Sequence, residues 1–170
     1  MSPDDSDEIY DLVDSDDRVI GQATRGEIHG KGLLHRSAHV LVFNSAGHLY
    51  LQKRSLQKDE SPGFWDTSAA GHLDAGEYYP EAAVRELNEE LSIAAELTEV
   101  LKISASQETH WEHIRVYRCT SDQTIVINPS EISEGRFWSL DGIREALTEN
   151  DPPFTSTFRL IHRRHLSINY

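Results

Sequence analysis

The residue types best suited to metal chemistry in this chain lie between positions 77 and 90. Glu77, Arg85, Glu86, Glu89 and Glu90 stand at offsets that bring the last three carboxylates together on one side of an α-helix. Like charges at this spacing repel each other, so such a cluster is favourable when a cation binds to it. Carboxylate oxygens suit a hard ion such as Mg²⁺, with Mn²⁺ as a substitute, whereas Zn²⁺ prefers Cys and His. The pattern predicts a Mg²⁺ site for a diphosphate; the alternative is a solvated acidic helix face.

The helix that carries these glutamates is expected to begin near Pro80, because proline suits the first helical position. The apolar residues that follow at helical spacing, and are expected to be buried, are Ala83, Val84, Leu87 and Leu91. The preceding segment, residues 71–77, contains the turn sequence Asp-Ala-Gly and is expected to be a loop that leads into the helix.

The complete pattern resembles the signature of the Nudix (MutT-like) hydrolases, G-x5-E-x7-R-E-U-x-E-E-x-G-U, where U is aliphatic. In this chain it runs from Gly71 to Ile93 and departs only at Ser92, where the family has glycine. That position follows the helix, where glycine favours a left-handed cap, so serine is expected to cost about 1 kcal/mol or less. The resemblance implies an α/β fold, the Nudix α/β/α sandwich, with a mixed β-sheet and a catalytic loop-helix.

The resemblance also implies roles for the residues of the signature. Glu86, Glu89 and Glu90 are expected to hold Mg²⁺, and Glu77 is expected either to ligate the metal or to support the loop. Arg85 is expected to pair with Glu77 or Glu89 and so to orient a ligand. The implied activity is hydrolysis of a diphosphate linkage by metal-activated water.

Residues outside the helix complete the predicted site. A general base is required, and both Glu89 and Glu112 are open for that role. Lys53 and Arg54, at the end of a predicted strand, are candidates for binding phosphate, although a solvated strand end explains them equally well. Trp65 is a candidate for stacking against the substrate, with a place in the core as the alternative reading.

The first half of the chain resembles the isopentenyl-diphosphate isomerase branch of the same superfamily, in the segments LHRSAHVLVFN and YLQKRS. That isomerase uses a cysteine as an acid/base group in a strand T-N-x-x-C-x-H-P, and Ala70 occupies the matching position here. A methyl group cannot transfer a proton, so hydrolysis of a nucleoside diphosphate derivative or similar organic diphosphate is favoured over isomerisation. A non-catalytic diphosphate-binding module is the third possibility.

Three histidines stand at or near positions where the isomerase binds its own metal. These are His29, His35 and His72, and Glu112 matches a further carboxylate of that site. They predict either a vestigial or repurposed second metal site or a set of ordinary hydrogen-bonded histidines, and the two readings stay open.

Composition narrows the class of protein. A net charge of −13 over 170 residues argues against a partner that is a nucleic acid polymer or an anionic membrane. The single cysteine, Cys119, allows no internal disulfide, which favours a cytoplasmic location. Residues 1–8 are expected to be a disordered acidic tail and residues 9–170 a single domain, monomeric or homodimeric, that takes a small-molecule diphosphate.

In the remaining segments, apolar and polar residues either alternate, as in strands, or recur at helical spacing. The expected strands span residues 9–13, 18–23, 38–43, 48–54, 65–70, 97–106, 114–120, 124–127 and 135–140. The further expected helices span residues 141–148 and 155–166.

Overall fold

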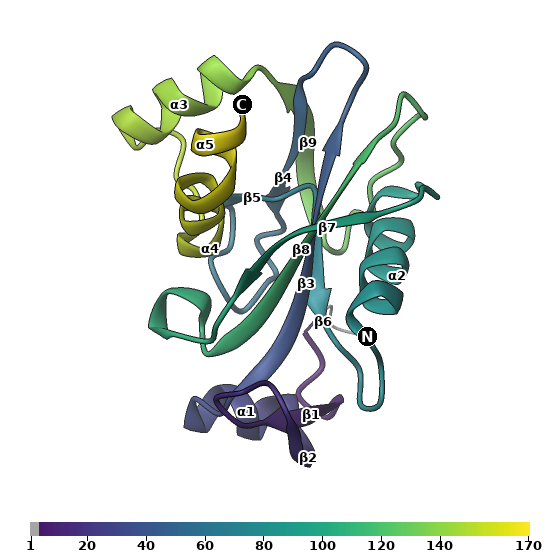
Figure 1. The fold of residues 1–170 in the computed structure, drawn as a ribbon, viewed down its shortest axis with the longest axis vertical. Coiled ribbons are helices and arrows are strands. Elements are labelled where there is room, and N and C mark those ends of the chain that lie inside the picture. The colour runs from purple at the N-terminus through teal and green to yellow at the C-terminus, as the bar shows by residue number, and fades with distance from the viewer. Residues whose placement is uncertain (1–3) are drawn as a thin grey trace.

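A mixed seven-stranded β-sheet forms the middle layer of the molecule in the computed structural model, which describes residues 4–170 (Figure 1). Its strands are β3 (His35–Phe43), β4 (Leu49–Arg54), β5 (Trp65–Asp66), β6 (Ala69–His72), β7 (Thr98–Ile103), β8 (Glu112–Thr120) and β9 (Ile132–Trp138). The order is β5-β4-β3-β8-β7, with β6 paired to β3 and β9 paired to β4. Only β3 and β8 are parallel among these pairs.

Helices cover both faces of the sheet (Figure 1). Helix α2 (Tyr79–Leu91) packs on one face over a core that includes Val40, Val42 and Leu87. On the other face lie α3 (Leu140–Glu149), α4 (Ser156–Ile161) and α5 (Ser167–Asn169), with a π-helical turn at His162–Leu166 between the last two. Leu41 and Phe158 belong to the core under these helices. The expected α/β/α sandwich with a mixed sheet is therefore confirmed.

An antiparallel hairpin and a short helix precede the sheet. The hairpin, β1 (Ile9–Val13) and β2 (Val19–Thr24), agrees with expectation. Helix α1 (Arg25–Lys31) was not expected, because two glycines within seven residues give a weak helical signal. It forms between two strong ends: a capping box of Thr24 and Glu27, and Gly32 in the left-handed conformation, while Ile28 is fully buried.

Residues 4–8 differ from the expected disordered tail. Asp4 makes ion pairs with Arg25 and Lys58, at 3.2 Å and 2.9 Å, and the backbone N–H of Gly26 donates to the carbonyl of Ser6. The first three positions of that predicted tail lie outside the described residues. No described helix has the length and apolar character needed to cross a membrane.

Several expected elements differ in detail. The predicted strand at 65–70 is divided into β5 and β6, and residues 124–127 form no strand. The predicted C-terminal helix is interrupted by the π-helical turn. In α2, Val84 is 50% exposed, whereas Ala82 is fully buried. The helix is rotated relative to the expected apolar stripe, and this rotation carries two of its glutamates into the buried face.

Candidate functional site

The glycine that opens the signature lies directly against a glutamate of α2. A Cβ atom added to Gly71 would meet Oε1 of Glu86 at 2.0 Å, so only glycine leaves room for that carboxylate. Because Gly71 is in β6, paired with β3, and Glu86 is in the middle of α2, this contact joins the sheet to the helix. The requirement for glycine at the start of the signature is therefore steric.

Arg85 organises the carboxylates around it. Its Nε and one terminal nitrogen donate to the two oxygens of Glu77, at 2.8 Å and 2.9 Å. The other terminal nitrogen donates to Glu86 at 2.7 Å and to Glu89 at 3.2 Å. The pairing expected with Glu77 or Glu89 is thus present with both. Glu77 also accepts from the backbone N–H of Asp74, so it ties the loop to the helix.

Glu86 and Glu90 are buried, whereas Glu89 is exposed. Burial is the main cause that raises the pKa of Glu86 to about 8, although Arg85 acts in the opposite direction. Burial and the charge of Glu86 together raise the pKa of Glu90 well above its ordinary range, and Gln52 donates to it at 2.5 Å. Two buried neighbouring carboxylates of this kind are unfavourable as anions unless a cation compensates them.

A fourth carboxylate, Glu131, lines the same cleft as Glu86, Glu89 and Glu90. It comes from the loop before β9, far from α2 in sequence, and its charge raises the pKa of both buried glutamates. We call these four residues the acidic compartment. Its all-oxygen donor set, with two buried carboxylates whose pKa is raised, fits a hard divalent cation. Sequence reasoning missed Glu131, since nothing local marks it as a neighbour of α2.

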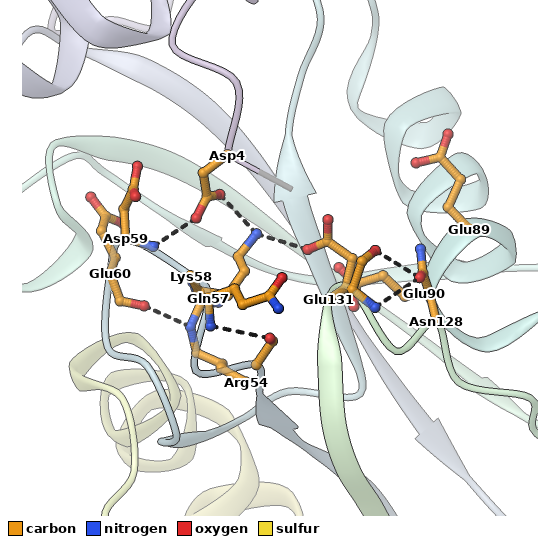
Figure 2. Close-up of polar contacts among 12 residues, drawn as sticks. Asp4, Arg54, Gln57, Lys58, Asp59, Glu60, Glu89, Glu90, Asn128 and Glu131 are labelled. Atoms are coloured by element: carbon orange, nitrogen blue, oxygen red, sulfur yellow. Dashed lines mark hydrogen bonds and ion pairs between the residues drawn. The ribbon is translucent and has the colours of Figure 1, made fainter. Parts of the chain in front are cut away.

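Two basic side chains face the acidic compartment, and neither was expected. Arg25, at the start of α1, and Lys58, in the loop after β4, both line the cleft. Figure 2 shows Lys58 between the carboxylates of Asp4 and Glu131, at 2.9 Å and 2.7 Å. Asp4 accepts in addition from the backbone N–H of Asp59 at 2.7 Å. Burial opposes these contacts, yet they lower the pKa of Asp4. Arg25 and Lys58 are the cations best placed to meet a phosphate.

The predicted substrate-binding residues occupy three different environments. Lys53 is half-exposed, lies 3.9 Å from Glu134, and lines neither part of the described cleft. Arg54, its neighbour on β4, does line the cleft. Successive strand residues point to opposite faces, which accounts for the difference. Trp65 is 3% exposed and packs edge-on against Trp138, which agrees with the alternative reading that places it in the core.

The three histidines form a cluster with Glu112 beside the acidic compartment. One potential ligand atom from each of His29, His35 and His72 lies within 4.8 Å of the other two. His72 Nε2 is 2.9 Å from Glu112 Oε1, and His35 Nε2 is 3.6 Å from it. The Nε2 atoms of His29 and His35 are buried with no hydrogen-bond partner among the described residues. Unpartnered imidazole nitrogens around a carboxylate fit a metal such as Zn²⁺ or Mn²⁺.

The electrostatics of the cluster follow from this packing. Burial, supported by the charges of His72 and Arg25, lowers the pKa of His29 to about 4. Burial also acts to lower the pKa of His35, but the Glu112 carboxylate outweighs it and the pKa is raised. The pKa of Glu112 lies well below its ordinary range because His72 and His35 overcome its burial. A neutral His29 and an ionised Glu112 are the forms that ligate metals.

Comparison with known proteins decides the family. The NUDIX domain family matches residues 33–158. The chain belongs to the Nudix family. It is 40% identical to an uncharacterized Nudix hydrolase of Pseudomonas aeruginosa, over 76% of this chain and 78% of that protein. It is 34% identical to isopentenyl-diphosphate Delta-isomerase 2 of Photorhabdus laumondii, over 91% of this chain and 90% of that protein. The resemblance to both branches of the Nudix family is thereby confirmed.

A solved structure shows the same fold over nearly the whole Nudix chain. The crystal structure of a Deinococcus radiodurans protein superposes with a TM-score of 0.81 at 29% identity, covering 93% of this chain and 99% of the other. The matched share of this chain is larger than residues 33–158, the part assigned to the NUDIX domain family.

Proposed function

We propose that this Nudix protein is a Mg²⁺-dependent pyrophosphohydrolase that acts on an organic diphosphate. The observation that carries the proposal is the acidic compartment, in which Glu86, against Gly71, and Glu90 are both buried, and in which Arg85 is the one described residue that makes an ion pair with either of them. Such a pair is retained at a stability cost, which is expected where a cation completes the site.

Glu86, Glu89, Glu90 and Glu131 would hold the divalent ion. Mg²⁺ is preferred and Mn²⁺ is expected to replace it, since all four donors are oxygens. When bound, the ion neutralises diphosphate oxygens and lowers the pKa of a bound water. Arg25 and Lys58, which line the same cleft, would bind the diphosphate. Arg85 and Glu77 are positioning residues that hold the carboxylates and the loop in place.

Glu89 is the better of the two candidates for the general base. Its side chain is exposed at the edge of the cleft and has a single contact, with Arg85, among the described residues. Glu112 already contacts His72, and its pKa is lowered well below the ordinary range, which makes it a poor proton acceptor. We therefore assign Glu112 to the histidine cluster, as a ligand of a second metal.

Isomerisation is the second candidate, because several relatives are named isopentenyl-diphosphate isomerases. Against it, Ala70 lies in the cleft where that family has a cysteine, and it pairs with His39 across β6 and β3. The sole cysteine, Cys119, is buried in β8 on the side of the sheet that faces α2. No thiol is therefore available in the described cleft to exchange a proton with the substrate.

The Glu90→Gln variant tests the hydrolase proposal. We expect Mg²⁺-dependent phosphate release to fall by at least about 100-fold, the upper end of what the loss of even an outer partner of a metal costs. The glutamine keeps the shape and the contact with Gln52, so thermal unfolding should show a folded protein. Glu81→Gln, in an exposed turn of the same helix, is the control and should retain activity. Full Mg²⁺-dependent activity in Glu90→Gln would refute the metal assignment.

A further inference from the structure

The cleft has a second part beyond the acidic compartment. The two parts share the lining residues Asp4, Arg25, Lys58, Ala70, Gly71 and His72, so they are continuous. The second part encloses about 590 Å³, including space open to solvent. We call it the polar compartment; its lining includes Ser37, His39, Arg54, Asp66, Thr155 and Thr157, and its other unshared residues, Glu60, Ser61, His110 and Glu112, are polar as well. A diphosphate held by Arg25 and Lys58 would direct its substituent into this space.

The lining of the polar compartment contains no Phe, Tyr or Trp among the described residues, and its largest aliphatic side chain is Ala70. An isoprenoid chain would find no apolar surface to bury against, and a nucleobase would find no six-membered aromatic ring on which to stack. The composition results from strand alternation. On β3, Ser37 and His39 lie on the same face as Leu41 and Phe43, so this face changes from polar to apolar along the strand.

Several polar atoms of buried side chains in this compartment have no hydrogen-bond partner among the described residues. Ser37, His39 and Thr157 are at most 5% exposed. Ser37 Oγ is buried with no hydrogen-bond partner among the described residues. No described residue bonds to His39 Nε2 or to Thr157 Oγ1 either, but these two atoms are not themselves fully buried. Buried polar groups are nearly always hydrogen-bonded in native proteins, so unpartnered ones that line a cleft indicate a ligand with complementary groups.

The direction of the hydrogen bonds indicates which groups a complementary ligand must carry. Thr67 Oγ1 donates to the carbonyl of Ala69, so it accepts from Nδ1–H of His39 at 2.8 Å. Burial lowers the pKa of His39, which leaves its Nε2 unprotonated and able to accept. Asp66 accepts, Arg54 donates, and the threonine and serine hydroxyls do both. Hydroxyl groups both donate and accept, so a polyhydroxylated group suits this mixture.

We propose that the polar compartment binds a small hydroxyl-rich substituent, of the sugar or polyol class, carried on the diphosphate. The proposal rests on the proposed hydrolase function, and it specifies the substrate class of that site. It predicts that the enzyme selects against five-carbon apolar diphosphates, including the substrate of the isomerase branch.

The experiment compares ribitol 5-diphosphate with isopentenyl diphosphate, two five-carbon substrates that differ in their hydroxyl groups. Mg²⁺-dependent phosphate release gives kcat/KM, and calorimetry with Ca²⁺ in place of Mg²⁺ gives binding without turnover. We expect the ribityl compound to be preferred by at least about 100-fold, because a site that bonds hydroxyls rejects analogues that lack them. Thr157→Val removes one hydroxyl without changing shape. It should lower kcat/KM for the ribityl compound about tenfold and leave the isopentenyl compound unaffected.

Thr148→Val, in the exposed last turn of α3, is the matched control and should leave both substrates unchanged. Three results would overturn the proposal: equal use of both compounds, an equal effect of Thr157→Val on both, or formation of dimethylallyl diphosphate. In each of these cases, Mg²⁺-dependent phosphate release would still support the hydrolase function. If neither compound is hydrolysed with Mg²⁺ or Mn²⁺, the hydrolase function fails. Binding then decides: selective binding of the ribityl compound that Thr157→Val abolishes supports the compartment, and equal binding overturns it.

Discussion

Glu86, Glu89 and Glu90 are chemically identical and close in sequence, yet their environments separate them. Glu86 and Glu90 lie in the buried face of α2, and Glu89 lies at its exposed edge. The buried pair has the raised pKa values, whereas Glu89 keeps its carboxylate open to the cleft. At this scale, burial rather than residue type separates the two glutamates with a raised pKa from the exposed glutamate that we propose as the general base.

The raised pKa of Glu86 predicts how stability depends on pH. In the metal-free fold this pKa is about 8, above the ordinary value of 4.5 expected in the unfolded chain. Burial of this carboxyl does not reduce the free energy of unfolding while the group is protonated in both states, below about pH 4.5. The free energy of unfolding then falls as pH rises toward 8, because the unfolded chain releases the proton more readily. We expect Tm in a chelator to fall between pH 5 and pH 8 by at least about 2 °C from this group.

Added Mg²⁺ should raise Tm most strongly at pH 8, because the metal and protons compete for the same carboxylate oxygens. Glu86→Gln should show a smaller decline with pH and no response to Mg²⁺, whereas Glu81→Gln should behave as the wild type does. Thermal unfolding followed by circular dichroism measures both the pH dependence of Tm and its response to Mg²⁺. A Glu86→Gln protein with the wild-type pH dependence would show that burial of this carboxyl does not control stability.

At the scale of elements, the ends of helices explain two departures from expectation. Ser92 ends α2 with φ of 56°, so the left-handed conformation that the Nudix signature assigns to glycine is present with serine. Helix α1 likewise depends on its capping box and on Gly32, since its interior sequence favours helix weakly.

Ser92→Gly is expected to stabilise the protein by up to about 1 kcal/mol, because glycine adopts a positive φ without steric cost. Chemical denaturation measures the change in the free energy of unfolding. Ser167→Gly is the control: its φ is −69°, so glycine should destabilise slightly, through the entropic loss and the loss of the hydrogen bond from Ser167 Oγ to the carbonyl of Arg163. Destabilisation by Ser92→Gly would mean that the serine makes compensating interactions.

At the scale of the whole molecule, the N-terminal segment closes over the cleft. Asp4 brings its carboxylate to Arg25 and Lys58, the two cations that a diphosphate would use, and Figure 2 shows its contact with Lys58. An anionic substrate and Asp4 therefore meet the same charges, and helix α1, the loop after β4 and the N-terminal segment come together at one point.

Asp4→Asn should lower KM for a diphosphate by about fivefold, because one competing charge worth roughly 1 kcal/mol is removed. The amide oxygen can still accept from the backbone of Asp59, which limits disturbance of the loop. Asp7→Asn, at an exposed position in the same segment, is the control. Steady-state kinetics at fixed ionic strength measures the effect. An unchanged or higher KM would show that Asp4 holds the cations in place for the substrate.

The Nudix signature predicted the loop, the helix and the pairing of Arg85 from sequence alone, because helical periodicity places residues three and four apart on one side. The same reasoning could not orient α2 about its own axis. It therefore expected Val84 in the core and treated the three glutamates as equivalent. The position of Trp65 was also beyond it, since an aromatic residue before a loop suits both a core and a binding surface.

Taken alone, the sequence determined the family and the fold class and predicted a reaction centre on α2, since all of these rest on local spacing that can be read without knowledge of distant contacts. Only the tertiary structure decided which other residues face that centre. Arg25, Lys58 and Glu131 come from three separate segments and meet α2 through packing of the sheet and its loops. The polar compartment, too, depends on residues of β3 and of the start of α4 lining the same cleft. Local periodicity carries no information about contacts between segments that are distant in sequence, because burial of the two hydrophobic cores determines those contacts.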